Sequence, residues 1–179
     1  GLIASAETLA VPGLDGREII WEAQPRQDVA LRCPALEVCY GGTKGGGKTA
    51  MLVMAPWEQI LYCHQRYLDT GRKQRGRWIT FRKELGELDD IIERSMEMYP
   101  ALDPAMGMNG WTKMEKRWRL SSGYIVDFRH LDGPDDHRRY NGKEISGLGF
   151  DQVEEISDEV YMFLAMQVRS KDDGMKKLL

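Results

Sequence analysis

The stretch Tyr40–Met51, which reads YGGTKGGGKTAM, decides the fold. Its residues 42–49 fit the pattern G-x-x-x-x-G-K-[ST], in which a glycine-rich loop surrounds a phosphate with backbone N–H groups. The preceding run ALEVCYGG (residues 35–42) is apolar and ends in glycine, so it predicts a buried strand. Apolar residues at helical spacing follow the loop. The stretch therefore predicts a strand, a phosphate-binding loop and a helix.

The loop predicts a site for a nucleoside triphosphate. Its glycines let the backbone approach the β-phosphate closely, and the start of the following helix adds a positive dipole end. The Lys48 ammonium is expected on the β- and γ-phosphate oxygens, and the Thr49 hydroxyl on Mg²⁺. No NKxD-like guanine-reading motif is present, so ATP is the expected nucleotide. The loop residues predicted to bind it are Gly42, Thr43, Lys44, Gly45, Gly46, Gly47, Lys48 and Thr49.

A magnesium ion held by such a loop also needs a carboxylate at the end of a buried strand. The segment GLGFDQVEEIS (residues 147–157) supplies one, because Asp151 directly follows a short apolar run. Asp127, in the apolar segment YIVDF, is the alternative if Asp151 is only a surface acid. The sequence therefore predicts that Thr49 and Asp151 together hold Mg²⁺.

Hydrolysis further needs a group that orients or deprotonates the attacking water. Many P-loop ATPases of the additional-strand type carry a glutamate directly after the metal-binding aspartate, but here that position is Gln152. An amide can orient water but cannot accept its proton. Glu154 and Glu155 follow, and either could reach the water, with Glu155 slightly favoured. A domain that binds nucleotide without hydrolysing it is the alternative.

The rest of the chain alternates between helical and strand patterns. Strands are predicted at 78–81, on both sides of the Ser-Ser-Gly turn at 121–123, and at 147–151. Helices are predicted at 25–33, at 48–71 with a break near Pro56, at 83–99 up to Pro100, and at 157–170 with Ser157 as N-cap. This alternation predicts an α/β fold, a P-loop NTPase of the additional-strand, RecA-like type with a mostly parallel sheet flanked by helices.

Length and charge limit the range of functions. The 179 residues suit one domain, taken as an arm or linker over residues 1–20 and a P-loop domain over residues 21–179. The net charge of −3 creates no general attraction to nucleic acid, so any such contact must be local. No apolar run approaches the roughly 20 residues that span a bilayer. Two basic clusters are candidates for phosphate-backbone contact: Arg72, Lys73, Arg75 and Arg77, and Lys113, Lys116, Arg117 and Arg119 with Trp111 and Trp118 interleaved.

The order of these segments over residues 21–169 resembles the ATPase domain of the phage terminase large subunit. The segments that carry the resemblance are QPRQDVAL, EVCYGGTKGGGKT, WITFRKELGELDDIIERSMEMYP, YIVDFRHLDGPDDHRRYNGKEISGLGFDQVEEIS and VYMFLAMQVRS. The resemblance implies a motor that couples ATP hydrolysis to packaging of double-stranded DNA into procapsids. It also implies a ring of subunits, a portal and a small terminase subunit as partners, and the cytoplasm of an infected bacterial host as location. The family's nuclease domain is not expected in this chain.

The same resemblance assigns further roles and shows departures. It implies that Gln27, or else Gln24, reads the adenine base. Lys44 stands where relatives often carry an arginine, which keeps the charge but loses the bidentate geometry. Asn141 stands where some relatives carry an arginine that reaches a neighbouring subunit, and Arg138 or Arg139 could replace it. A helicase-like P-loop ATPase is the remaining alternative.

Overall fold

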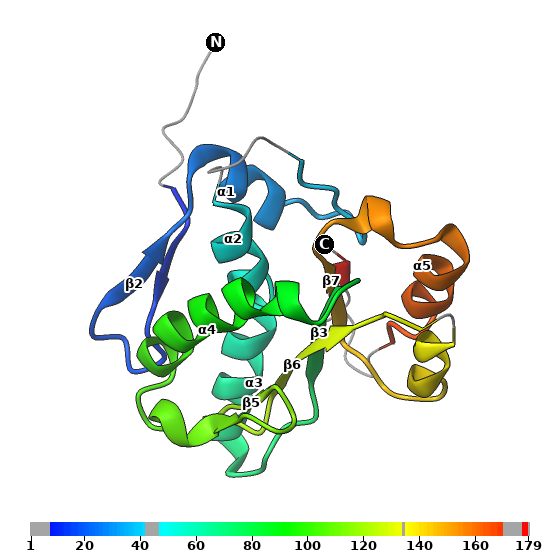
Figure 1. The fold of residues 1–179 in the computed structure, drawn as a ribbon. Helices are drawn as coiled ribbons and strands as arrows, with labels where there is room; N and C mark the ends of the chain where they lie inside the picture. Colours follow the sequence, from blue (N-terminus) through cyan, green and yellow to red (C-terminus); the bar gives the residue numbers. More distant parts are fainter. Residues whose placement is uncertain (1–7, 42–46, 134, 170–176, 179) are drawn as a thin grey trace.

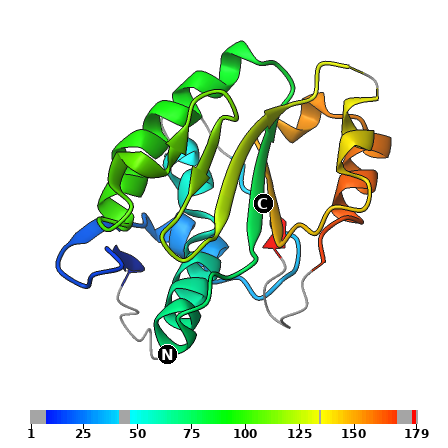
Figure 2. The ribbon, with the colours of Figure 1, turned by 90° about the horizontal axis from the view of Figure 1, so that it is seen from below.

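The computed structural model describes residues 8–41, 47–133, 135–169 and 177–178. Over these residues the chain is a mixed α/β structure in which one sheet lies between two layers of helices (Figures 1 and 2). None of the described helices is both long enough and apolar enough to cross a membrane.

The described sheet has six strands in the order β4-β5-β6-β3-β7-β8. Parallel ladders join β6, β3, β7 and β8, whereas antiparallel ladders join β4, β5 and β6. The sheet is therefore mixed, and the expected parallel pairing holds only from β6 to β8. The strands are β3 Arg77–Arg82, β4 Trp111–Thr112, β5 Arg117–Arg119, β6 Ile125–His130, β7 Gly147–Phe150 and β8 Lys177–Leu178.

One face of the sheet packs against three helices, α2 (Lys48–Met54), α3 (Trp57–Thr70) and α4 (Asp89–Leu102). Alternate strand residues point into this core, among them Trp78, Trp118 and Phe128. The predicted break near Pro56 separates α2 from α3, and α3 ends at Gly71 in the left-handed conformation, as its position predicts.

On the opposite face, the described residues form a second core over β3 and β7. There Ile79 and Phe81 pack with Leu148 and Phe150 under α5 (Asp158–Ala165) and the 3₁₀ turn η3 (Asp136–Tyr140). The helix cap at Ser157 is confirmed, because its side chain accepts a hydrogen bond from the Val160 N–H. In Figure 2 this second layer lies beside β7, on the side of the sheet away from α4.

The N-terminal segment, expected as an arm, contains a small antiparallel hairpin of β1 (Ala10–Pro12) and β2 (Ile19–Glu22). Leu9 and Val11 are buried in the same core as α4, so the start of the hairpin packs against the domain, whereas residues 15–19 at its turn are exposed. The predicted helix follows as α1 (Pro25–Leu31). The other described 3₁₀ turns are η1 Gly86–Leu88, η2 Gly107–Gly110 and η4 Val153–Glu155.

The strand predicted over residues 35–42 is wrong for its described part. Residues 36–41 are irregular apart from an isolated bridge at Glu37, and most of them are exposed. A strand needs a ladder partner, and the outer edge of β7 is paired at Gly147 and Leu148 with β8. Within residues 36–41, only the side chains of Val38 and Tyr40 pack against the core between the sheet and helices α2, α3 and α4.

The prediction that Pro100 stops its helix is also wrong. Helix α4 begins later than expected, at Asp89, and continues through Pro100 to Leu102. A proline inside a helix removes one backbone hydrogen bond, but packing offsets this cost. Tyr99 and Leu102 are both buried, and the Tyr99 hydroxyl donates to the Val53 carbonyl oxygen at 2.7 Å.

Candidate functional site

A cavity of about 380 Å³ lies at the carboxyl end of β7, beside the first turn of α2. We call it the α2–β7 cavity. Its size falls within the range of ligand sites in proteins. The residues that line it are Glu37, Val38, Cys39, Tyr40, Gly41, Lys48, Met51, Leu52, Phe150, Asp151, Gln152, Val153, Glu154 and Tyr161. It therefore brings together two segments that the sequence singled out separately, the start of α2 and the segment after β7.

Close packing of α2 on β7 produces this juxtaposition. A Cβ atom added at Gly149 of β7 would lie 2.7 Å from Leu52 Cδ1 of α2. A side chain at position 149 would therefore have to displace the end of the Leu52 side chain and would crowd the Trp78 ring, whose Cζ2 would lie 3.2 Å away. Gly149 thus marks the place where α2 packs closely on β7, with Lys48 at the start of the helix and Asp151 just after the strand.

The described part of the glycine loop begins at Gly47. Its φ of 69° is left-handed, and the residue immediately precedes α2, so that Lys48 and Thr49 form the first turn. Lys48 lines the α2–β7 cavity, whereas Thr49 is half-buried and does not line it. The contacts predicted for Gly42, Thr43, Lys44, Gly45 and Gly46 lie outside the described residues and stay predictions.

Gln27, predicted to read adenine, is tied to the end of the loop instead of facing solvent. Its side chain is buried, Nε2 donates to the Gly47 carbonyl oxygen at 2.9 Å, and Oε1 accepts the Gln24 N–H at 2.7 Å. A Cβ at Gly47 would lie 2.5 Å from Nε2, and its left-handed φ of 69° also favours glycine at this position. The adenine role stays a prediction for Gln27 and Gln24, neither of which lines the α2–β7 cavity.

Asp151 lies where the sequence predicted, at the carboxyl end of β7 and on the wall of the α2–β7 cavity. Its N–H donates to the Phe81 carbonyl oxygen at 2.9 Å, which continues the pairing with β3. Its Oδ2 is 2.9 Å from Nη1 of Arg82. The Asp151 charge is thus balanced by a cation from the neighbouring strand.

Sequence reasoning missed Arg82. Arg82 and Asp151 stand at the ends of two strands that prove to be parallel neighbours. The carboxyl ends of such strands meet at one edge of a sheet. The pairing of β3 with β7 was the information that a single sequence did not supply.

Gln152 combines an unusual backbone with an unpaired polar atom. Its φ of 55° is left-handed, a conformation that non-glycine residues adopt at a cost and often at functional sites. Its Oε1 is buried without a hydrogen-bond partner among the described residues. Because an unpaired buried acceptor costs about 1–3 kcal/mol, this oxygen is a ready acceptor for a donor that enters the cavity.

The two glutamates after Gln152 both lie in the turn η4 and are both exposed. Glu154 lines the α2–β7 cavity, whereas Glu155 is not part of its wall. Sequence reasoning slightly favoured Glu155, and the geometry favours Glu154. The two glutamates are adjacent positions of one 3₁₀ turn, and only Glu154 belongs to the cavity wall.

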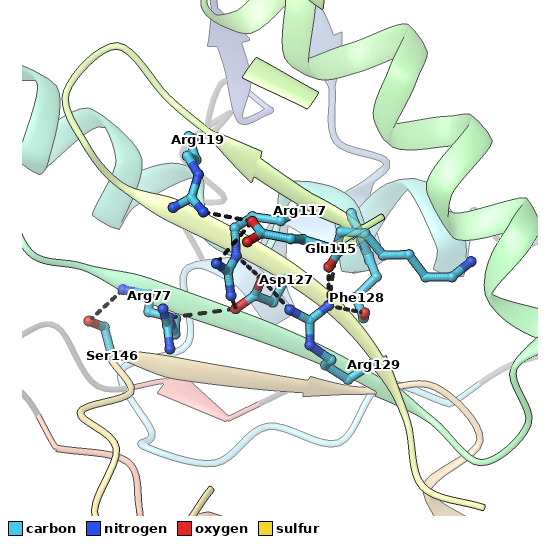
Figure 3. A network of polar contacts seen from close by, with 9 residues as sticks. Arg77, Glu115, Arg117, Arg119, Asp127, Phe128, Arg129 and Ser146 are labelled. Carbon is cyan, nitrogen blue, oxygen red and sulfur yellow. Dashed lines mark hydrogen bonds and ion pairs between the residues drawn. The ribbon is translucent and has the colours of Figure 1, made fainter. Parts of the chain in front are cut away.

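The alternative metal ligand, Asp127, lies elsewhere. It sits in the middle of β6, and its carboxylate is surrounded by three guanidinium groups, at 2.5 Å from Arg117, 2.8 Å from Arg129 and 3.5 Å from Arg77 (Figure 3). Its side chain is only 2% exposed. Asp127 is therefore a buried ion-pair partner and does not line the α2–β7 cavity.

This network also accounts for the two arginines of the second basic cluster. Arg117 is bound to Asp127 and to Glu115, and Arg119 is 2.6 Å from Glu115. The tryptophans Trp111 and Trp118 of this cluster pack with each other. Trp118 is buried, donates its indole N–H to Ser95 Oγ at 2.9 Å, and packs against Trp111. The first cluster is less constrained, since Arg72 and Arg75 are exposed.

Arg138 and Arg139 lie on η3 with their side chains at least 70% exposed, and they pair with Asp135 and Asp136. Exposed pairs of this kind are weak, so both guanidiniums could exchange partners. Their predicted reach to a neighbouring subunit stays a prediction.

The arrangement can bind an anion at Lys48, hold a cation at Asp151 and orient a small donor at Gln152, all within one cavity. Among the described residues no group of three or more histidine, cysteine or acidic side chains is placed to hold a metal ion by itself. Comparison with models of known protein families found no match, and comparison with curated proteins found no similar protein.

Proposed function

We propose that this chain binds ATP in the α2–β7 cavity and hydrolyses it, as the ATPase domain of a phage-type large terminase. The observation that supports this most is the meeting of Lys48 and Asp151 on one cavity wall, although they come from distant parts of the sequence. The packaging of double-stranded DNA rests on the resemblance of the segment order. The cavity supports the nucleotide chemistry, which is the part that direct binding tests first.

In this proposal Lys48 neutralises the phosphate oxygens. An ammonium on a cavity wall forms charge-assisted hydrogen bonds to phosphate, which are stronger than neutral ones. Met51, Leu52, Phe150 and Tyr161 form an apolar part of the wall of the same cavity. Electrostatic attraction to the phosphates is stronger in such surroundings than in bulk water.

The residues present fit a magnesium ion. Mg²⁺ is usually bound through one or two carboxylates, phosphate oxygens and water, so a larger acidic cluster is not required. The Asp151 carboxylate on the cavity wall would hold it, and when bound it would stabilise negative charge on the phosphates. Thr49 does not line the cavity, so the role predicted for its hydroxyl stays a prediction. Arg82 would have to share or release Asp151 in that state.

Gln152 and Glu154 are the candidates for handling the attacking water. The unpaired Oε1 of Gln152 can accept a hydrogen bond from water and so orient it. The Glu154 carboxylate, on the same wall, can accept the proton that water loses. The alternative, a nucleotide-binding domain that does not hydrolyse ATP, would leave Glu154 without a role.

Replacing Glu154 by glutamine is expected to lower the rate of ATP hydrolysis by about 100-fold, since general-base catalysis contributes at least that much. The matched change Glu155→Gln is expected to leave the rate within about twofold, because Glu155 does not line the cavity. Phosphate release from labelled ATP, with and without duplex DNA, measures both. Equal effects of the two changes would contradict the role of Glu154, and no release from the unmodified protein would favour the non-hydrolysing alternative.

Replacing Arg82 by glutamine is expected to strengthen divalent-cation binding by about tenfold without nucleotide, because Asp151 loses a competing positive charge. Mn²⁺ titration followed by electron paramagnetic resonance measures the affinity. The exposed neighbour Lys83, changed to glutamine, removes the same charge without removing the ion pair and serves as control. Unchanged Mn²⁺ affinity in Arg82→Gln would show that Asp151 is not the cation ligand.

A further inference from the structure

A second pocket, of about 330 Å³, lies at the opposite end of the parallel strands from the α2–β7 cavity. Its wall is formed where β3, β6 and β7 begin, since Arg77, Ile125 and Ser146 stand at or next to the first residues of these strands. The remaining lining residues are Gln74, Arg75, Gly76, Gly123, Lys143 and Glu144. We call it the amino-end pocket.

The charged lining of this pocket is unbalanced. Arg75, Arg77 and Lys143 contribute three cations, and Glu144 contributes one carboxylate. Lys143 lies 5.0 Å from the centroid of the Tyr140 ring, and no ion pair joins it to a carboxylate among the residues that the structure describes. Arg77 has only a longer contact, of 3.5 Å, to Asp127.

Asp127 cannot neutralise Arg77 fully, because two other arginines hold it more closely. Arg117 binds it through two nitrogens at 2.5 and 3.2 Å, and Arg129 binds it at 2.8 Å (Figure 3). One carboxylate is thus shared among three guanidiniums. The surplus positive charge lies next to the amino-end pocket, on the Arg77 side chain.

The directions of the pKa shifts of Arg77 and Lys143 agree with this surplus. Burial lowers the pKa of Arg77, and the neighbouring arginines lower it further against the opposing effect of Asp127. Burial also lowers the pKa of Lys143, with Arg77 and Arg129 as the next causes. Burial is the main cause in both groups and neighbouring cations add to it, so a bound anion would favour the charged forms of both side chains.

We infer that the amino-end pocket binds a phosphate group through Arg75, Arg77 and Lys143. Arginine presents paired N–H donors that match phosphate oxygens, and lysine adds a compact charge. The phosphate can come from a nucleic-acid backbone, which runs past as a series of such groups, or from a free phosphate ion. The site is separate from the α2–β7 cavity and does not depend on ATP binding there.

The test compares the unmodified chain with the double change Arg75→Gln and Lys143→Gln. Arg77 is left in place because it contacts Asp127 and its loss could disturb the fold. Arg94→Gln, at a half-exposed position of α4 that does not line the pocket, serves as control. Inorganic phosphate and a 20-base-pair duplex, about two helical turns long, are the probes, titrated separately.

Binding is followed by backbone amide chemical shifts in nuclear magnetic resonance spectra. Shifts at Gly76 and Gly123 report the amino-end pocket, and shifts at Lys48 and Thr49 report the α2–β7 cavity. We expect phosphate to shift Gly76 and Gly123, and its dissociation constant there to rise about tenfold or more in the double variant but not in Arg94→Gln. Signals at Lys48 test the proposed nucleotide site separately, so the two proposals can fail independently.

The duplex identifies the source of the phosphate. Shifts at the same amides by duplex, weakened by salt and lost in the double variant, would establish a backbone-binding site. Shifts by inorganic phosphate alone would establish a site for a free phosphate ion. If neither probe shifts Gly76 and Gly123, or if the double variant binds both as tightly as the unmodified chain, the inference is wrong.

Discussion

Lys48→Ala is expected to raise the dissociation constant for ATP by about 100-fold or more, since it removes a charge-assisted contact to phosphate from a cavity wall. Isothermal titration with ATP and Mg²⁺ measures the change. Lys113→Ala, an equal truncation at an exposed position away from the cavity, is expected to leave the dissociation constant unchanged. Circular dichroism shows whether each variant is folded.

This prediction separates the nucleotide proposal from its competitors. Equal affinity in Lys48→Ala and in the unmodified chain would overturn the assignment of the α2–β7 cavity to ATP. If Lys48→Ala loses ATP binding and the unmodified chain does not hydrolyse ATP, the result would instead support a nucleotide-dependent assembly role. Lys48→Arg keeps the charge and is expected to recover part of the affinity, because charge contributes even where the geometry is changed.

Asp127→Asn is expected to lower the free energy of unfolding by about 3 kcal/mol. Removing one partner of a buried ion pair leaves the other uncompensated, which costs 3–5 kcal/mol when both are fully buried. The Asp127 side chain is 2% exposed, but Arg117, Arg129 and Arg77 are between 16 and 26% exposed, which places the loss near the lower end. Urea unfolding followed by tryptophan fluorescence measures it.

Glu115→Gln is the matched control, because Glu115 pairs with Arg117 and Arg119 at the surface, with 43% of its side chain exposed. Surface pairs contribute about 0–1 kcal/mol, so this variant is expected to unfold at nearly the original urea concentration. A loss below about 1 kcal/mol in Asp127→Asn would mean that the buried carboxylate is not needed to hold the three arginines together.

The helices and the centre of the sheet followed from local signals. Pro56 and Gly71 set the break and the end of the α2–α3 pair, and Ser157 capped α5 where its position predicted. These are interactions between residues a few positions apart, which a sequence displays directly. Pro100 was misread because the packing of Tyr99 and Leu102 against distant elements outweighed a local preference.

The incorrect predictions share a dependence on distant partners. Residues 36–41 have the composition of a buried strand, but a strand forms only where a ladder edge accepts it. Asp127 and Asp151 both follow apolar residues, and only the sheet shows that one is enclosed by arginines while the other faces a cavity. The sequence did contain one indication that Asp127 is an ion-pair partner, because Arg117 precedes it and Arg129 follows it.

The hydrogen bond from Gln27 to Gly47 spans 20 positions and so joins the two ends of a long segment before any ligand arrives. Bringing such ends together costs conformational entropy, and in this chain that entropy is lost on folding, before a ligand binds. A ligand that binds at Lys48 then meets a helix start whose position is already determined, and less of its binding free energy is spent on ordering the chain. A cut in the backbone between Gln27 and Gly47 would transfer that cost to the binding step, and ligand affinity would fall although no contact residue had changed.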